Sequence, residues 1–171
     1  QYGADAVRWF ILSDSPPEKD VQWSDTGVVS ANKFLQKIWN LNFLISNREN
    51  KNFDEKLDRK FTLEINNYVN KIDSSIKNFR FNVSIAHFYE VYKIFKEGLD
   101  TAIGTNLLAN NMIKIMKLML PFTPHLANEC LELLNCKSIN QWPEIDKKNA
   151  LDEVKFAVQI NGKTRDIIVV E

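Results

Sequence analysis

The side chains of this sequence that are best suited to binding chemistry are three pairs of basic residues. Lysine and arginine supply many of the phosphate contacts by which proteins hold nucleic acids, so each pair is a candidate phosphate-binding site. The pairs are Lys33 and Lys37, Lys77 and Arg80, and Lys163 and Arg165. Lys33 and Lys37 are four residues apart, which places both on one face of a helix. A solvated helix face explains that spacing equally well, and Arg80 is equally suited to bonding the last carbonyls of a helix.

Residues able to act as nucleophiles or metal ligands are few. His87 and His125 are the only histidines, and they lie far apart in the sequence. Cys130 and Cys136 are six residues apart, a spacing that matches no common zinc motif. The five glycines form neither a P-loop nor a G-x-G-x-x-G motif, and the sequence has no G-x-S-x-G. We therefore expect two reduced thiols, no catalytic residue, no metal site and no cofactor bound by this chain itself.

The bulk composition is typical of a soluble globular protein. The 171 residues are 44% hydrophobic and 26% charged, and 22 basic side chains balance 22 acidic ones. A neutral chain has no global basic field, so contact with a nucleic acid would need a local patch. No signal peptide is visible after Gln1, and no apolar run approaches the roughly 18 residues of a membrane helix. These features favour a cytoplasmic protein that does not contact a membrane.

Hydrophobic periodicity predicts the helices that must position the basic residues. Apolar side chains recur every three or four residues through most of the chain. The predicted helices cover residues 2–12, 25–45, 57–79, 82–99, 108–122 and 124–134. Asp25 and Asn82 are candidate N-caps, and Thr123 with Pro124 is a typical helix start. Two prolines in the segment 13–25 favour an extended strap. Long amphipathic helices joined by short links predict an antiparallel bundle.

The four tryptophans are expected in or against the core of this bundle. They are Trp9, Trp23, Trp39 and Trp142. Trp142 precedes a proline in a segment without helical periodicity, and we expect it to pack back onto the helices and close the bundle. Base stacking is the alternative role for a tryptophan that is exposed.

The last segment differs from the helices, because apolar and polar residues alternate over residues 154–161. The dipeptide Asn-Gly at 161–162 is a strong hairpin signal, so two β-strands are predicted. An isolated two-stranded hairpin is marginally stable, and we therefore expect that the chain stops inside a second domain. The expected register pairs Ile160 with Lys163, Val158 with Arg165 and Phe156 with Ile167.

Several stretches of the chain resemble the class I aminoacyl-tRNA synthetases. The segment after their catalytic signature loop is similar to YGADAVRWFILSDSPPEKDVQWSD (2–25). Their helical anticodon-binding domain is similar to RFNVSIAHFYEVYK (80–93), and its end is similar to MLPFTPHLANECLELL followed by QWPEID (119–146). Two stretches most resemble the leucine branch, the leucyl-tRNA synthetases, in its bacterial type. They are PPEKDVQWSDTGVVSANKFLQKIW (16–39) and VQINGKTRDIIVV (158–170).

The resemblance implies a mainly α fold, in which a helix bundle of the anticodon-binding type precedes the start of a small α/β domain. Residues 1–24 would be a connecting helix and strap after the catalytic domain, and residues 25–145 the bundle. Residues 150–171 would be the truncated start of the C-terminal domain, a β-hairpin. The catalytic and editing domains would precede Gln1. The parent enzyme would use ATP and Mg²⁺ to join leucine to its tRNA, whereas this part would be inactive alone.

The resemblance also implies partners and a role for the basic residues. The implied partners are leucine tRNA and the catalytic and editing domains of the same chain, in a monomeric enzyme. The six basic residues would hold tRNA phosphates, without reading the anticodon, which the leucine enzymes are understood not to recognise. Arg8, Asp25 and His125 are expected to be structural. Two alternatives stay open: the equivalent domain of an isoleucine, valine or methionine enzyme, and a helical protein-interaction scaffold with no RNA role.

Overall fold

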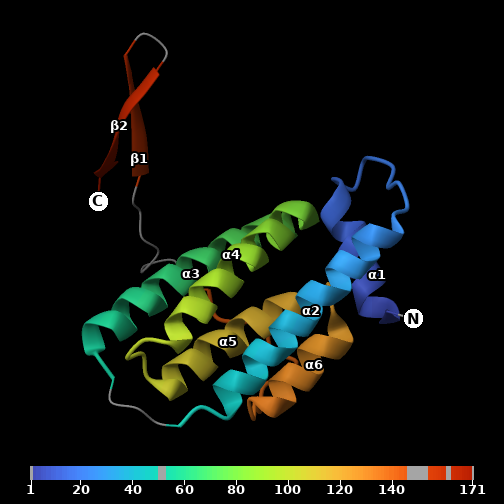
Figure 1. The fold of residues 1–171 in the computed structure, drawn as a ribbon, viewed down its shortest axis with the longest axis horizontal. Helices are drawn as coiled ribbons and strands as arrows, with labels where there is room; N and C mark the ends of the chain where they lie inside the picture. The colour runs from blue at the N-terminus through green and yellow to red at the C-terminus, as the bar shows by residue number, and fades with distance from the viewer. Residues whose placement is uncertain (1, 50–52, 146–153, 161–162, 171) are drawn as a thin grey trace.

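Six helices and two strands make up the part of the chain that the structure describes (Figure 1). The structure is a computed structural model, and it describes residues 2–49, 53–145, 154–160 and 163–170. The helices are α1 (Gly3–Asp14), α2 (Asp25–Ser46), α3 (Glu55–Lys77), α4 (Phe81–Leu99), α5 (Thr105–Met119) and α6 (Pro124–Leu133). Each helix predicted from the periodicity is confirmed, with ends displaced by at most three residues. The protein is therefore mainly helical, and consecutive helices from α2 to α5 alternate in direction.

The residues that begin α2 and α4 differ from the predicted caps. Ser24, not Asp25, is the N-cap of α2, and its Oγ accepts a backbone hydrogen bond at 3.2 Å. Asp25 is the first helical residue and accepts instead from the indole N–H of Trp23 at 2.8 Å. The α4 helix begins at Phe81 without a side-chain cap, so Asn82 is not its N-cap.

The turn between α3 and α4 explains why α4 starts where it does. The N–H of Arg80 bonds to the carbonyl of Ser75 at 2.8 Å, and the N–H of Phe79 bonds to that of Ile76 at 3.0 Å. This pair of bonds is the Schellman motif that ends many helices. Phe79 occupies its left-handed position with φ of 56°, where glycine is usual. The motif reverses the chain, so helical geometry resumes directly after Arg80.

Aromatic rings from different helices meet in the core. Trp9 of α1 is fully buried, and its ring centroid lies 5.3 Å from that of Phe34 in α2. Its other core neighbours are Phe88 of α4 at 5.8 Å and Phe122, between α5 and α6, at 6.2 Å. Tilted and edge-to-face pairs of this kind are typical of buried aromatic clusters. The α1 helix, predicted as part of a connecting segment, thus contributes the largest buried side chain of this cluster.

Trp9 lies in the core, whereas the other three tryptophans are partly exposed. Trp23 is 58% exposed, Trp39 is 37% exposed and Trp142 is 44% exposed. Trp142 does contact the bundle, because its indole N–H donates to Asp73 of α3 at 2.9 Å. An indole that reaches a partner near the surface leaves part of its ring in water. Trp39 lies on the outer side of α2, next to the cleft described below.

Two antiparallel strands, β1 (Val154–Ile160) and β2 (Lys163–Val170), follow the helices. The register shifts by one residue at Arg165, as in a β-bulge. The predicted register was therefore right next to the turn and wrong beyond the shift. The turn itself, at 161–162, lies outside the described residues. The observed pairs are Ile160 with Lys163, Val158 with Asp166 and Phe156 with Ile168.

Candidate nucleic-acid interface

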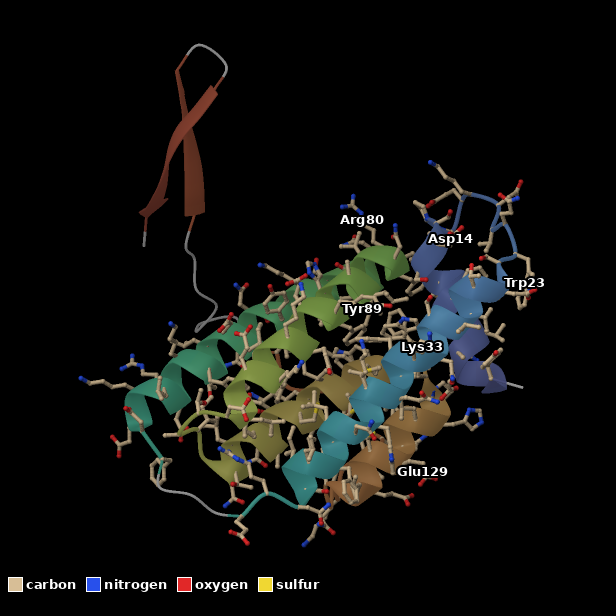
Figure 2. All side chains as sticks on the ribbon, viewed as in Figure 1. Asp14, Trp23, Lys33, Arg80, Tyr89 and Glu129 are labelled. Atoms are coloured by element: carbon tan, nitrogen blue, oxygen red, sulfur yellow. The ribbon has the colours of Figure 1, made fainter. Side chains whose placement is uncertain are left out.

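The outer face of α2 carries basic and aromatic side chains. Lys33, labelled in Figure 2, is exposed there, and so is Lys37, one helical turn further along. Residues 26–48 contain no aspartate or glutamate, so no acidic side chain of α2 lies near the two lysines. The ring of Trp39, 37% exposed, also lies on α2. Cations without an acidic neighbour on their own helix keep their field available for an anionic partner.

A cleft of about 640 Å³ lies between the start of α1, the middle of α2 and the start of α6. The α2 helix lines it with Trp39 and with three amide side chains, Asn32, Gln36 and Asn40. The α6 helix contributes His125, whose side chain is largely exposed. The cleft thus combines an aromatic surface with groups that both donate and accept hydrogen bonds.

Asp5 of α1 is the buried carboxylate at the edge of this cleft. One oxygen lies 2.9 Å from Nδ1 of His125 and 3.0 Å from a guanidinium nitrogen of Arg8. The other oxygen accepts the backbone N–H of Leu126 at 2.8 Å. Asp5 therefore caps α6 from another helix, whereas the predicted cap, Thr123, makes no side-chain capping bond. Arg8 and His125 both have the structural contacts expected of them.

Lys77 and Arg80 lie at the turn between α3 and α4, but their surroundings differ. The ammonium of Lys77 lies 2.7 Å from Oδ2 of Asp73, one helical turn earlier. Arg80 is exposed at the start of α4 (Figure 2), and its backbone N–H is the group that bonds a carbonyl at the end of α3. Lys163 begins β2, and Arg165 lies at its register shift. The three predicted pairs thus lie on three different segments: α2, the turn between α3 and α4, and β2.

Sequence reasoning missed the exposed position of Trp39 in the cleft and the structural contacts of Asp5 and Asp73. The signal for Trp39 was present, because the core stripe of α2 includes Leu35 and Ile38 and leaves Trp39 off it. The two aspartates gave no signal. Besides Arg8 and Lys77, which are close in the sequence, their partners lie 69 to 121 residues away, so only the folded chain shows those contacts.

A cysteine and a histidine are among the described groups outside the cleft whose pKa values are shifted. Burial raises the pKa of the Cys130 thiol to about 12, and Glu129 adds to this shift. Burial also lowers the pKa of His87, and the positive charge of Lys71 lowers it further. Cys130 and Cys136 are both free thiols, and a thiol with so high a pKa is inert as a nucleophile at neutral pH.

The described ranges hold neither a metal-ligand cluster nor a membrane-spanning helix. There, His, Cys, Asp and Glu side chains do not gather in threes as metal ligands would. Nor does any helix in those ranges have the length and apolar character needed to cross a membrane.

The proteins similar to this chain are tRNA ligases. A family model described as the anticodon-binding domain of tRNA ligase matches residues 58–171. The chain belongs to this family. Over 177 aligned positions it is 38% identical to the leucine–tRNA ligase of Hyphomonas neptunium, and over 180 positions 36% identical to that of Prochlorococcus marinus. These alignments cover 99% and 100% of the chain but only 20% and 21% of the relatives, so the chain spans about a fifth of their length.

A solved structure shares the fold of this anticodon-binding domain. It is the agnB2 LeuRS of Agrobacterium radiobacter K84, in a ternary complex with tRNA and LeuAMS. The TM-score is 0.79 at 23% identity, and the match covers 99% of this chain and 23% of that one. The resemblance to class I synthetases of the leucine branch, predicted from the sequence, is confirmed by these similarities.

Proposed function

We propose that this chain is the tRNA-binding part of a leucine–tRNA ligase. It would position the tRNA for ATP-dependent leucylation by a catalytic domain elsewhere in the parent enzyme. The observation that carries this proposal is the 36–38% identity to leucine–tRNA ligases along essentially the whole chain. The same identity favours leucine over isoleucine, valine or methionine as the amino acid of the parent enzyme. The partners would be leucine tRNA and the catalytic and editing domains.

The outer face of α2 is the proposed main contact with tRNA phosphates. Lys33 and Lys37 are exposed on one face of a helix that has no acidic residue between positions 26 and 48. Two such cations can replace two counterions of an RNA strand, which favours binding at low salt. The contact fixes position rather than sequence, because phosphates are the same in every tRNA.

The other two basic pairs are proposed as weaker contacts. Lys77 is already held by Asp73, so Arg80 is the more available cation at that turn. Lys163 and Arg165 would act from the small C-terminal domain, to which we assign β1 and β2. The division of the chain at about residues 24 and 145–150 belongs to the same proposal, although the family match runs through both strands.

The leucylation chemistry is assigned to the catalytic part of the parent enzyme. ATP and Mg²⁺ would bind there, as the resemblance to class I synthetases implies. The chain alone should be inactive in leucine-dependent ATP–pyrophosphate exchange. Exchange above background, in a preparation free of host synthetase, would contradict this assignment.

The binding proposal is tested by titrating labelled leucine tRNA with the chain at salt concentrations from about 50 to about 200 mM. If the chain neutralises about three to five phosphates, log K should fall against log salt with a slope of about −2 to −5. The neutral double variant Lys33→Gln/Lys37→Gln should make this slope shallower by the contribution of about two phosphate contacts. It should weaken binding of leucine tRNA and of other tRNAs alike.

The outcome also separates the remaining alternative. A wild-type chain that binds no tRNA at any salt concentration would be a scaffold for the catalytic body. An unchanged slope in the double variant would place the phosphate contacts elsewhere on the chain.

A further inference from the structure

The ring of Trp39 is the feature of the cleft that core packing does not explain. The neighbouring core residues of α2, Leu35 and Ile38, are 6% and 3% exposed, whereas Trp39 is 37% exposed and lines the cleft. Exposed aromatic rings in grooves are the platforms on which proteins stack unpaired nucleobases. A ring in this position is suited to the same use.

Three amide side chains share the cleft with this ring. Asn32, Gln36 and Asn40 lie at successive turns of α2 and line the same cleft as Trp39. An amide offers two donors and one acceptor, which matches the mixed donors and acceptors on the edge of a nucleobase. The volume of about 640 Å³ lies within the range of roughly 300–1,000 Å³ for small-ligand pockets. One nucleobase with its ribose fits such a space.

The charges around the cleft favour a nucleic acid over a protein segment. Lys33 follows Asn32 directly, and Lys37 follows Gln36, so each lysine lies about 100° around α2 from an amide of the cleft. Asp5 is the acidic residue among those described as lining the cleft, and its oxygens already bond a guanidinium, an imidazole and a backbone N–H. A phosphate near the rim would thus meet lysines rather than an unpaired carboxylate.

We propose that this cleft holds one unpaired nucleobase of the bound tRNA, stacked on the ring of Trp39. The amides of α2 contact the edge of the base, while Lys33 and Lys37 hold the phosphates beside it. This inference rests on the proposed function, since it names the part of the tRNA that the α2 surface receives. Stacking accepts any base, so the cleft selects for an unpaired nucleotide rather than for a sequence.

The test compares three variants of the 171-residue chain with leucine tRNA. Trp39→Ala should weaken binding by about five- to a hundredfold at every salt concentration and leave the salt slope unchanged, because stacking involves no counterion release. Trp39→Phe keeps a stacking ring and should restore most of the affinity. Phe43→Ala is the matched control: Phe43 lies one turn further along α2, is more exposed, and does not line the cleft. It should bind within about twofold of wild type.

A fluorescence readout separates stacking from a general loss of structure. Addition of a single-stranded RNA of about ten nucleotides should quench tryptophan emission in the wild-type chain and not in Trp39→Phe. A fully paired, blunt-ended RNA duplex at the same phosphate concentration should leave this emission unchanged. If Trp39→Ala fails to fold by circular dichroism, the loss of quenching in Trp39→Phe decides the question.

The two proposals fail in distinguishable ways. The base-binding cleft would be overturned if both Trp39 variants kept the affinity and the quenching of the wild type. The proposed tRNA binding would stand if the salt slope still depended on Lys33 and Lys37. The cleft would then be a contact for another part of the enzyme. A wild-type chain that binds none of the three RNAs would overturn both.

Discussion

The helices α2 and α3 have 22 and 23 residues and the same net charge, but they distribute that charge differently. The α2 helix has two lysines and one aspartate, and the aspartate is its first residue. The α3 helix has five basic and four acidic residues, intermixed along its length. A count of basic residues alone would favour α3 as the nucleic-acid surface, whereas their arrangement favours α2.

The contacts made by α3 show what its charges do. Asp73 holds Lys77 at 2.7 Å and also accepts the indole N–H of Trp142. Asp58 accepts the backbone N–H of Gly104 at 2.9 Å, which ties α3 to the start of α5. Opposite charges a few ångströms apart cancel each other well within the Debye length of about 10 Å. Two acidic residues of α3, Asp58 and Asp73, are therefore bonded within the fold, whereas Lys33 and Lys37 have no acidic neighbour on their own helix.

Charge reversal on each helix gives the largest expected difference. At about 0.1 M salt, Lys33→Glu/Lys37→Glu should weaken binding of leucine tRNA by roughly 100-fold, because two phosphate contacts become repulsions. The matched variant Arg59→Glu/Lys60→Glu makes the same change of net charge at two exposed positions of α3. It should weaken binding by less than about fivefold. Equal losses, measured by fluorescence anisotropy, would show that net charge rather than arrangement governs binding.

Trp142→Phe tests the internal use of the α3 charges. This change removes the indole N–H that donates to Asp73, a residue only 5% exposed, and leaves its carboxylate with one partner fewer. The free energy of unfolding in urea should fall by about 1–3 kcal/mol. Trp23→Phe removes the equivalent bond to Asp25 at an exposed site and should cost less than about 0.5 kcal/mol. Similar losses for the two variants would mean that Asp73 is not an anchor of the bundle.

The helices could be predicted from the sequence because their signal is local. Apolar residues spaced three or four apart define the buried face of each helix, and Ser24 or Pro124 marks a start within a residue or two. The same logic placed Lys33 and Lys37 on one exposed face. It could not separate three exposed tryptophans from the buried one, because a large aromatic ring suits a core and a surface contact equally well.

The rest of the candidate site could not be predicted, because it depends on contacts distant in the sequence. The cleft exists only where the starts of α1 and α6 meet the middle of α2. Asp5 reaches α6 across 120 residues, and no local pattern distinguishes it from an ordinary acidic residue in a first helical turn. The register shift at Arg165 was also missed, because residue alternation predicts a strand but not a bulge.

The ends of the two helices offer a smaller test. The C-cap of α2, Asn47, has φ of −100°, whereas the turn after α3 holds Phe79 at φ of 56°. Phe79 is 66% exposed, so its ring contributes little packing to offset the strained backbone. Phe79→Gly should raise the free energy of unfolding by about 0.5–1 kcal/mol. The control Asn135→Gly, also at φ of 56°, should gain less, because asparagine tolerates this conformation. A loss of stability in Phe79→Gly would show that the ring has a packing role.

The smallest expected effect concerns pH and another cation of α3. Burial of His87 on α4 lowers its pKa below the ordinary value of 6.5, Lys71 of α3 lowers it further, and Glu90 opposes the shift. As the pH falls, the unfolded chain therefore takes up this proton first. The contribution of His87 to stability is complete above pH 6.5 and decreases as the pH falls toward the folded pKa. His87→Gln should remove this decrease from urea melts recorded between about pH 7 and about pH 5. Lys71→Gln should only reduce it, because burial is the larger cause, and Lys33→Gln on α2 should leave it unchanged. If His87→Gln kept the pH dependence of the wild type, the loss of stability at low pH would come from other groups. Lys71 and His87 would then not be coupled in the way described.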